Sequence, residues 1–401
     1  MERHRYLIVG GGMTADAAVR GIREKDPEGT VSIVGSEAEA PYKRPPLTKG
    51  LWKSDPEETI WYWTEALGVT FHSGRTIRMI DPEHHVAVDD LGNLHGYEKL
   101  LLATGSSPRR LPFEDDRILH FRTYADYNRL RDLWHAGERF AVIGAGFIGM
   151  EIAAALSMND REVVMLFPGE TLGGRIFPAS LGESLNAYYL HKGVELYPGS
   201  QVTGVRREGS RLAVEVRNAK SGLPRTFPVD AVVAGIGVTP NVSLARSAGL
   251  QVGDGVRVDD FLRTSAPDVY AAGDVAEFFN PALGRRIRVE HEDNARKMGK
   301  AAGRSMAGAG EPYTYLPFFY SDLFELGFEA VGMVDASLEA VQDWIEPNRK
   351  GVVYYLQDRR VRGVLLWNVW KQVEAARKLI ADPGPFDAAS LLRRLPAAKA
   401  A

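Results

Sequence analysis

The chain has 401 residues, which is enough for two or three domains that each bury a core of their own. Its formal net charge is only −3, and lysine and arginine are scattered without a basic stripe, so the composition argues against nucleic-acid binding. Cysteine is absent, which excludes a thiol nucleophile, a cysteine metal site, a disulfide framework and a dithiol redox relay within the chain.

We expect no targeting peptide, because an apolar strand at residues 6–9 starts almost at once. The longest apolar stretch, residues 140–156, is broken by glycines and by Glu151, so we expect a strand, a turn and a helix there rather than a membrane span. The sequence therefore predicts a cytoplasmic protein without a membrane partner.

The first segments follow the order of a parallel sheet with crossover helices. The strand at residues 6–9 runs into Gly10, Gly11 and Gly12, a helical pattern continues to residue 23, and a second strand follows at residues 31–34. Later segments lead to a strand at residues 100–102, which ends in the turn Ala103-Thr104-Gly105.

The same order recurs in the middle of the chain. A strand at residues 140–143 precedes a glycine-rich turn at residues 144–149, a helix through residue 157 and a strand at residues 163–167. We interpret the two copies as a weak internal repeat of a nucleotide-binding fold. Two further apolar strands are predicted at residues 229–235 and 269–272.

The last ninety residues change character. Residues 351–356 and 361–367 are β-rich, and the polar turn Asp358-Arg359-Arg360 between them predicts an antiparallel hairpin. A helix at residues 373–381 is expected to close this part, and the tail at residues 396–401 is expected to be frayed.

The first glycine motif, Gly10-x-Gly12-x-x-Ala15, has a physical reason for each small residue. Gly10 permits the tight turn, Gly12 lets the backbone approach a pyrophosphate, and Ala15 lets the helix pack closely on the strand. The helix N-terminus then offers N–H donors to the phosphates. Ser36 and Glu37, just past the second strand, are placed to bind a ribose.

The second motif is a complete fingerprint, from Gly144 through Gly146 to Gly149, again between a strand and a helix. After its second strand come Gly169 and Glu170, where a ribose 2′-hydroxyl would lie. The acidic Glu170 favours NAD(H), and the nearby Arg175 keeps NADP(H) as the less favoured alternative.

Two dinucleotide folds in one chain imply two dinucleotides that meet, and a nicotinamide that donates hydride to a flavin is the economical pair. We therefore expect an α/β protein with two Rossmann-like dinucleotide-binding domains, one for FAD and one for NAD(P)H, plus a C-terminal α+β domain with an antiparallel sheet. The predicted FAD domain spans residues 1–110 and 239–310, the NAD(P)H domain residues 111–238, and the C-terminal domain residues 311–401.

Further motifs resemble those of ferredoxin reductases and apoptosis-inducing-factor-like flavoproteins. The segment PYKRPPLTK at residues 41–49 resembles the signature that follows the first βαβ unit, near the point where relatives with a redox disulfide carry CxxxxC. The turn at residues 103–105 and the segment TSAPDVYAAGD at residues 264–274 resemble two other markers of the superfamily.

The last third of the chain is similar to the apoptosis-inducing-factor-like branch. The similar segments are RVEH at 288–291, FYSDL at 319–323, GFEAVG at 327–332, and the β-rich runs followed by AARK at 375–378. The long insertion of the mitochondrial proteins and their basic DNA-binding surface have no counterpart here. Cofactor chemistry is therefore the only part of the resemblance that we carry over, and roles in cell death are not carried over.

The resemblance also implies two sets of cofactor-binding residues. Those expected to bind FAD are Gly10, Gly12, Ala15, Ser36, Glu37, Arg44, Lys49, Ile77, Ala103, Thr104, Gly105, Arg122, Gly273, Asp274, Glu290, His291 and Tyr320. Those expected to bind NAD(H) are Gly144, Gly146, Phe147, Ile148, Gly149, Glu151, Gly169, Glu170, Arg175, Gly237, Glu290, His291 and Glu329.

Lys49, Glu151 and His291 are the residues for which the resemblance implies a catalytic role. Lys49 would lie near the flavin N5 and pair with Glu151, so that its charge faces the developing negative charge of the flavin. His291 would stack on the nicotinamide, and its protonation near neutral pH would tune affinity. Phe147 would shield the nicotinamide face, its alternative being a plain core aromatic. Asp274 would bind the ribityl chain, its alternative is a helix N-cap, and the two roles can coexist.

The leading interpretation is an FAD-containing NADH:acceptor oxidoreductase, with a long-lived complex of reduced flavin and NAD+ and a redox-dependent homodimer implied by the resemblance. One alternative is a reductase that hands electrons to a small carrier such as a ferredoxin or rubredoxin. The other is an NADH-responsive redox sensor that acts by dimerisation with little turnover. No metal site is expected, because the nine histidines are scattered and the adjacent His84 and His85 point to different faces.

Overall fold

The structure, a computed structural model, describes residues 2–395, and its internal contacts divide the chain into two compact units. Unit 1 consists of Met1–Arg44, Glu57–Ser107 and Thr239–Phe318, and unit 2 of Pro45–Pro56, Pro108–Val238 and Phe319–Ala401. The tail at residues 396–401, for which fraying is predicted, lies outside the described residues. Between residues 2 and 395, no helix is long and apolar enough to cross a membrane.

Unit 1 is built on a seven-stranded sheet. Its strands are β1 (Glu2–Val9), β2 (Val31–Val34), β3 (Val69–His72), β4 (Ile77–Asp81), β5 (Val86–Asp89), β6 (Leu94–Leu102) and β18 (Val269–Ala271). The order β3-β2-β1-β6 is parallel throughout, whereas β4 and β5 form an antiparallel meander that pairs with the first residues of β6. Strand β18 pairs with the last residues of β6, which brings residues 269–271 back into the first sheet.

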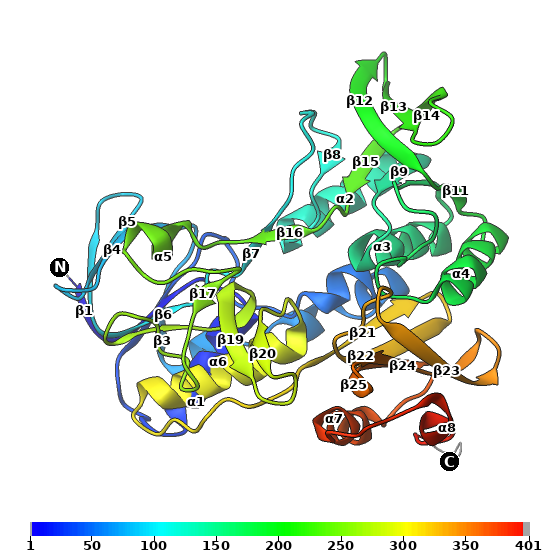
Figure 1. Cartoon of the computed structure of the whole chain (residues 1–401). Coiled ribbons are helices and arrows are strands. Elements are labelled where there is room, and N and C mark those ends of the chain that lie inside the picture. The colour runs from blue at the N-terminus through cyan, green and yellow to red at the C-terminus, as the bar shows by residue number, and fades with distance from the viewer. Residues whose placement is uncertain (1, 396–401) are drawn as a thin grey trace. The chain divides into compact units, whose positions relative to one another are not determined.

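Two helices pack side by side in unit 1, although they are far apart in the sequence (Figure 1). They are α1 (Met13–Arg23) and α6 (Glu292–Met306). Strand β2 and the second half of β1 are buried, as expected for strands of a parallel sheet that is covered on both faces. The predicted helix through residue 23 and the strand at residues 31–34 are thus confirmed, whereas α6 was not predicted.

The remaining elements of unit 1 are short. A three-stranded sheet has the order β17-β19-β20. The bounds are η3 (Glu57–Ile60), η4 (Thr64–Leu67), α5 (Ser243–Ser247), β17 (Val256–Arg257), η5 (Gly273–Val275), β19 (Ala276–Asn280) and β20 (Arg285–Ile287). Strands β7 (Ser106–Pro108) and β16 (Val238–Pro240) lie where the chain leaves unit 1 and returns to it.

Unit 2 contains a second parallel sheet, of five strands in the order β11-β10-β9-β15-β8. Its strands are β8 (Ile118–Leu119), β9 (Arg139–Ile143), β10 (Glu162–Leu166), β11 (Glu195–Tyr197) and β15 (Ala231–Ala234), and its helices are α2 (Tyr124–Ala136), α3 (Phe147–Met158) and α4 (Ala179–His191). The predicted repeat of strand, glycine turn, helix and strand is therefore confirmed. The strand predicted at residues 229–235 is confirmed as β15, but it begins only at Ala231, because Val229 ends the preceding strand and Asp230 separates the two strands.

The first of those two strands belongs to an antiparallel sheet of the order β12-β13-β14. Its members are β12 (Ser200–Glu208), β13 (Arg211–Asn218) and β14 (Pro224–Val229). Asp230 accepts hydrogen bonds from the backbone N–H groups of Glu138 and Arg139, and it forms an ion pair with Arg211. These contacts turn the chain from one sheet into the other.

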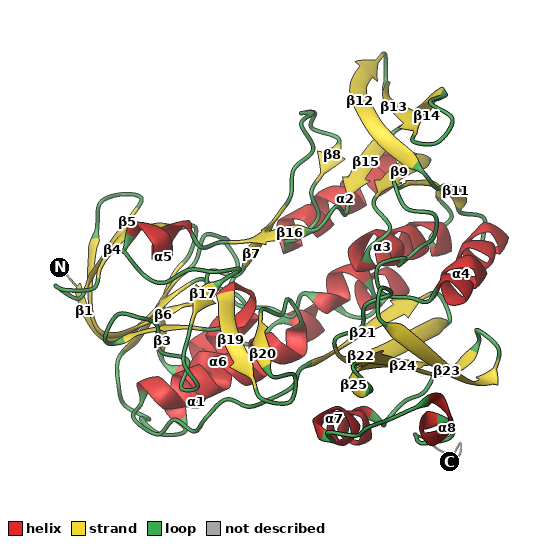
Figure 2. Ribbon diagram, viewed as in Figure 1, coloured by secondary structure: helices red, strands yellow, loops and turns green. Residues whose placement is uncertain are grey.

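A five-stranded antiparallel sheet forms the C-terminal part of unit 2, with α7 and α8 beside it (Figure 2). Its order is β21-β22-β25-β24-β23, and the bounds are β21 (Phe318–Leu323), β22 (Leu326–Gly332), β23 (Glu339–Glu346), β24 (Lys350–Gln357), β25 (Arg360–Trp367), α7 (Val373–Ala381) and α8 (Ala388–Leu391). The predicted hairpin is confirmed, except that its turn is the pair Asp358-Arg359, both with positive φ, and Arg360 already pairs within β25. The α/β class with two parallel nucleotide-type sheets and a C-terminal antiparallel sheet is likewise confirmed.

Unit 2 also holds the segment that follows Arg44. It forms two 3-10 turns, η1 (Pro45–Thr48) and η2 (Gly50–Lys53). Trp52 packs edge-on against Tyr127 and Trp134 of α2, and its carbonyl accepts from the side chain of Asn159 at 3.0 Å. These contacts place Lys49 within unit 2.

Candidate functional site

The first glycine loop has the shape that a bound pyrophosphate needs. Gly10 has φ +116°, and a Cβ there would lie 2.2 Å from the carbonyl oxygen of Ala103, so only glycine fits. At Gly12, the N-cap of α1, the nearest atom to such a Cβ is 3.9 Å away, and no side chain caps the helix. The space beside Gly12 and the uncapped N–H groups of α1 therefore fit a phosphate. Ala15 is fully buried, as close packing of helix and strand requires.

Glu37 lies just past β2 and is held by two neighbours. One carboxylate oxygen accepts from Arg44, and the other accepts from the Tyr42 hydroxyl at 2.5 Å. Ser36 is exposed beside it. The structure thus brings Ser36, Glu37 and Arg44 together at the carboxyl end of β2, the edge at which nucleotides bind to parallel sheets.

The turn after β6 and the turn after β18 meet in unit 1. The buried Ser106 hydroxyl donates to Asp274 Oδ2 at 2.8 Å, and Thr104 exchanges hydrogen bonds with Asn241 at 2.8–2.9 Å. Asp274 caps neither neighbouring helix, since the N-cap of η5 is Ala272 and that of α6 is His291. The alternative of a helix N-cap for Asp274 is therefore wrong.

The remaining residues that were expected to bind FAD in unit 1 differ in environment. Ala103 follows β6 and Gly273 begins η5, whereas Ile77 is buried in the core of the unit. Glu290 pairs with Arg288, which also reaches Asp254. His291 follows directly, at the N-terminus of α6.

His291 is neutral at neutral pH. Burial lowers the pKa of His291 to about 4, against the opposing effect of the Asp274 carboxylate. The expectation that its protonation near neutral pH tunes affinity is therefore wrong for the folded chain. A neutral imidazole is still able to stack on an aromatic ring.

This shift predicts an acid-sensitive stability. The pKa of His291 is about 4 in the folded chain and ordinarily about 6.5, so the unfolded chain binds the extra proton between these values. Stability is fully present above about pH 6.5 and falls as the pH drops towards 4. We expect His291→Gln to show a smaller loss of melting temperature between about pH 7 and about pH 5 than the parent chain. The same loss in both proteins would contradict this, and the exposed His84→Gln serves as the control.

The second glycine loop, in unit 2, repeats the geometry of the first. A Cβ on Gly144, whose φ is +108°, would lie 2.4 Å from the carbonyl oxygen of Gly235, and one on Gly149 would lie 2.3 Å from that of Gly144. At Gly146, the N-cap of α3, the nearest atom is 4.0 Å away. Gly144 and Gly149 are thus required by the fold itself, whereas the open space at Gly146 fits a second pyrophosphate.

The other residues expected to bind NAD(H) by their position in the nucleotide fold lie around the same sheet. Glu170 follows β10, is exposed, and forms a 3.0 Å ion pair with Lys220. Gly169 and Arg175 are exposed in the same loop, and Gly237 follows β15. Ile148, in the first turn of α3, is 40% exposed.

Lys49 and Glu151 form the expected ion pair, with Nζ 2.7 Å from Oε2, although 102 positions separate them. Glu151 is only 3% exposed in its side chain and Lys49 12%. Two hydroxyl groups also donate hydrogen bonds to the Glu151 carboxylate, Thr48 to Oε2 and Ser321 to Oε1, each at 2.6 Å. A buried carboxylate with three donors holds the ammonium group in a defined position.

An aromatic surface lies beside this pair. The Lys49 ammonium is 5.4 Å from the centre of the Tyr320 ring, which is 37% exposed. Phe147, the first residue of α3, packs against Phe319 at 4.9 Å and Phe328 at 6.0 Å between ring centres. Phe147 is part of an aromatic cluster yet is not fully buried, so its role as a shield of the nicotinamide stays a prediction.

Glu329 on β22 carries an unused acceptor. Its Oε2 is buried and has no hydrogen-bond partner among the described residues. Burial raises the pKa of Glu329, and a backbone N–H of Lys371 opposes the shift. A buried carboxyl oxygen without a hydrogen-bond partner is suited to accept a hydrogen bond from a ligand, for example from the amide N–H of a nicotinamide.

We expect Glu329→Ala to weaken NADH binding about ten- to a hundredfold, because it removes the acceptor for a ligand N–H. Titration of NADH by isothermal calorimetry would measure the dissociation constant. Glu339→Ala, an exposed glutamate on β23 of the same sheet, is the matched control. Equal affinities in both variants would refute the assignment of Glu329.

Two functional side chains were missed by the sequence reasoning. Thr48 and Ser321 donate hydrogen bonds to Glu151. A single hydroxyl residue next to a predicted site residue forms no sequence motif that would indicate this role. Thr48 lies within the PYKRPPLTK segment and Ser321 within FYSDL, which was the available signal. Arg122 precedes α2, and its backbone N–H donates to Asp126 at 3.0 Å, while the FAD contact expected of it stays a prediction.

Comparison with known proteins adds to this geometry. Residues 4–299 match the family model of pyridine nucleotide-disulphide oxidoreductases, and residues 302–349 and 343–382 match the model described as apoptosis-inducing factor, mitochondrion-associated, C-term. The chain is 34% identical over 429 residues to apoptosis-inducing factor 1, mitochondrial, of Dictyostelium discoideum, covering 95% of this chain and 79% of that protein.

Two further similarities concern ferredoxin reductases. The chain is 33% identical over 392 residues to the ferredoxin–NAD(+) reductase component of the anthranilate 1,2-dioxygenase system of Burkholderia cepacia, covering 95% of both. Its structure is similar to that of putidaredoxin reductase in a covalent complex with putidaredoxin, with a TM-score of 0.87, 27% identity, and 96% and 94% of the two chains covered.

Proposed function

We propose, because the chain belongs to the family of pyridine nucleotide-disulphide oxidoreductases, that it passes electrons from NADH through FAD to a small carrier protein of the ferredoxin type. The chain is an FAD-dependent NAD(P)H oxidoreductase without a redox-active disulfide, since it contains no cysteine. FAD, when bound, accepts a hydride from the nicotinamide and releases electrons onward. What the chain's own residues contribute is binding, orientation and charge.

The two glycine loops support the assignment of the two nucleotides. The open space at Gly12 and at Gly146, each at an uncapped helix N-terminus, would receive the two pyrophosphates. Glu37 and Glu170 would each bind a ribose, and the carboxylate of Glu170 would disfavour a 2′-phosphate. NADH over NADPH is therefore the proposed preference.

The observation that carries the proposal is the ion pair between Lys49 and Glu151. Relatives with a redox disulfide have cysteines near this segment, whereas here the segment ends in a lysine whose ammonium is fixed by a buried carboxylate. We propose that Lys49 offers its positive charge to the side of the flavin on which negative charge develops. Tyr320, whose ring lies beside Lys49, would limit the positions that the flavin ring occupies.

The electron acceptor is proposed from the similarity of this chain to ferredoxin reductases over almost their whole length. The Burkholderia protein is covered over 95% of its length, and its printed role is a ferredoxin–NAD(+) reductase component. With no cysteine in the chain, we identify no group that would relay electrons between the flavin and such an acceptor. A cytoplasmic location accompanies this proposal and stays a prediction.

Anaerobic stopped-flow mixing with NADH, with NADPH, and then with a ferredoxin tests the function. We expect rapid bleaching of the flavin by NADH, slower bleaching by NADPH, and fast recovery of the yellow colour on adding the ferredoxin. A protein that binds no flavin, or a flavin that NADH does not bleach, would overturn the reductase assignment. Bleaching without transfer to any ferredoxin would overturn only the acceptor.

A second candidate is favoured by the match of residues 302–349 and 343–382 to the C-terminal model of apoptosis-inducing factor. In that case reduction would produce a long-lived complex with NAD+ and a homodimer, and turnover would be slow. Sedimentation of the protein with and without NADH separates the two candidates. A protein that stays monomeric under both conditions would contradict the second candidate, which is a redox sensor that acts by dimerisation.

A further inference from the structure

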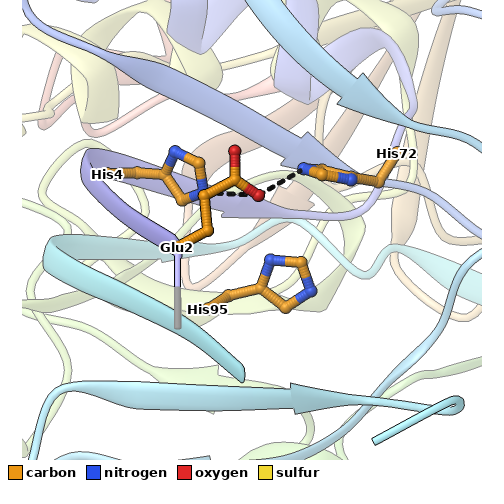
Figure 3. A group of neighbouring side chains, drawn as sticks. All are labelled: Glu2, His4, His72 and His95. Carbon is orange, nitrogen blue, oxygen red and sulfur yellow. Dashed lines mark ion pairs between the residues drawn. The ribbon is translucent and has the colours of Figure 1, made fainter. Parts of the chain in front are cut away.

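Three histidines and one glutamate gather in unit 1, on strands β1, β3 and β6 (Figure 3). We call this group the three-histidine cluster; its members are Glu2, His4, His72 and His95. Each offers one ligand atom, and these four atoms lie within 4.8 Å of one another. The parallel pairing of β1 with β6, in which Glu2 is opposite His95, brings the first and last members together, and His72 comes from the end of β3.

The spacing inside the cluster suits an ion better than it suits hydrogen bonds. Glu2 Oε2 lies 3.8 Å from His4 Nε2 and 3.9 Å from His72 Nε2, too far for hydrogen bonds to either ring (Figure 3). The centres of the His72 and His95 rings are 5.1 Å apart. Tetrahedral ligands about 2.0–2.1 Å from a zinc ion are about 3.4 Å from each other. Small side-chain rotations would therefore close the cluster around one ion.

The imidazole nitrogens of the cluster lack partners. His4 Nε2, His72 Nε2 and His95 Nδ1 are buried and have no hydrogen-bond partner among the described residues. The side chains of His4 and His95 are only 5% and 4% exposed. One buried polar atom without a partner costs about 1–3 kcal/mol, so three that face the same point need a reason. A single metal ion would satisfy all three.

Asp89 orients His95 as a carboxylate orients the histidine ligand of a metal. His95 Nε2 lies 3.2 Å from Asp89 Oδ2, so Nε2 carries the proton and the lone pair is on the unpartnered Nδ1. The side-chain amide of Asn93 also donates to Asp89 Oδ2 at 3.0 Å. The Arg75 guanidinium is 2.6 Å from the same Asp89 oxygen, which leaves Glu2 as the negative charge that faces the imidazoles.

Two members of the cluster are partly exposed to solvent. Glu2 is 55% exposed in its side chain and His72 26%. An ion therefore has a path from solvent to the ligands.

We propose that the three-histidine cluster is a binding site for one divalent transition-metal ion, with Zn²⁺ as the ion that its ligands suit best. Three imidazole nitrogens and one carboxylate oxygen supply four ligands of the types that zinc binds, enough for a tetrahedral site. Such an ion would join β1, β3 and β6 and so stabilise the start of the chain on the first sheet. It is independent of the proposed electron transfer.

Calorimetric titration of the untagged full-length flavoprotein with ZnCl₂, after removal of metal with a chelator, tests the site. We expect one ion per chain and a rise in melting temperature on binding. Titration with CoCl₂ should produce tetrahedral absorption bands to the red of the flavin, and X-ray absorption of the zinc form should show nitrogen and oxygen ligands at about 2.0–2.2 Å.

Three variants locate the site. Glu2→Gln changes an exposed side chain and should weaken Zn²⁺ binding at least about tenfold, while His72→Ala should abolish it. Asp89→Asn should weaken it about ten- to a hundredfold through the loss of the partner of His95. His84→Ala is the matched control, because that exposed histidine pairs with Asp81 outside the cluster. No stoichiometric binding by the parent chain, or unchanged binding by both Glu2→Gln and a folded His72→Ala, would overturn the proposal.

Discussion

Replacing Lys49 with alanine is expected to slow the reduction of the bound flavin by NADH about a hundredfold. The proposed role of Lys49 is to place one positive charge where negative charge develops, and removing one such preorganised group costs about that factor in other enzymes. The buried Glu151, 2.7 Å from the ammonium group, would then keep its own negative charge without the partner. The change therefore removes a favourable charge and also leaves an unfavourable one.

The same substitution is expected to lower the free energy of unfolding by about 3–5 kcal/mol, the typical cost of breaking a buried ion pair. Thr48 and Ser321 still donate to Glu151, which keeps the loss towards the lower end. Because damage to the fold would also slow the rate, the double variant Lys49→Met with Glu151→Gln is needed. It removes both charges, so it should recover stability without recovering the rate.

Anaerobic stopped-flow absorbance measures the rate, and thermal unfolding monitored by circular dichroism measures stability. Lys53→Ala is the matched control, since Lys53 lies in the same segment and is exposed. Lys49→Ala with an unchanged reduction rate and an unchanged flavin spectrum would show that the assignment of Lys49 to the flavin is wrong. Recovery of the rate in the double variant would show that charge at this position is not what matters.

Gly146→Ala is expected to raise the dissociation constant for NADH at least about tenfold while leaving the protein folded. The added methyl group meets nothing in the chain closer than 4.0 Å, and the φ of −83° at Gly146 is open to alanine. Its cost would therefore arise only when a pyrophosphate approaches the N-terminus of α3. A rise of tenfold corresponds to about 1.4 kcal/mol of binding free energy.

For Gly149→Ala we expect the opposite result, damage to the fold itself, and this variant therefore serves as the contrast to Gly146→Ala. Its methyl group would lie 2.3 Å from the carbonyl oxygen of Gly144, so the backbone must shift and the melting temperature must fall. Met158→Ala, at the exposed far end of α3, is the control for changes to the helix itself. Calorimetric titration with NADH and a thermal melt on each variant separate ligand clash from fold damage. An unchanged affinity in Gly146→Ala would mean that the nucleotide does not bind at this loop.

Some of the site was predictable because its signals are local. The strand before each glycine loop, the loop and the helix after it depend on residues within about four positions of each other, through apolar runs and the sterics of glycine. Helix α7 was predicted at its observed bounds for the same reason. The pairing of Lys49 with Glu151 was predicted from family resemblance, since no rule of spacing connects them.

Helix α6 shows why other parts were missed. It contains Gly299 and Gly303, which weaken the helical signal of a sequence. In the fold, a Cβ on Gly303 would lie 2.0 Å from the carbonyl oxygen of Ala18, and one on Gly299 would lie 2.4 Å from that of Thr14. These glycines are thus present for the close approach of α6 to α1, a requirement that exists only once the two helices meet.

Two nucleotide-type folds, two phosphate-binding loops and the absence of a disulfide could be predicted, since each follows from local pattern or from composition. The hydrogen bonds from Thr48 and Ser321 to Glu151, and the approach of histidines from three separate strands, exist only in the folded chain. Adjacent histidines such as His84 and His85 attract attention in a sequence, whereas His4, His72 and His95 do not. Strand order and register bring these three together, and both are properties of the folded sheet.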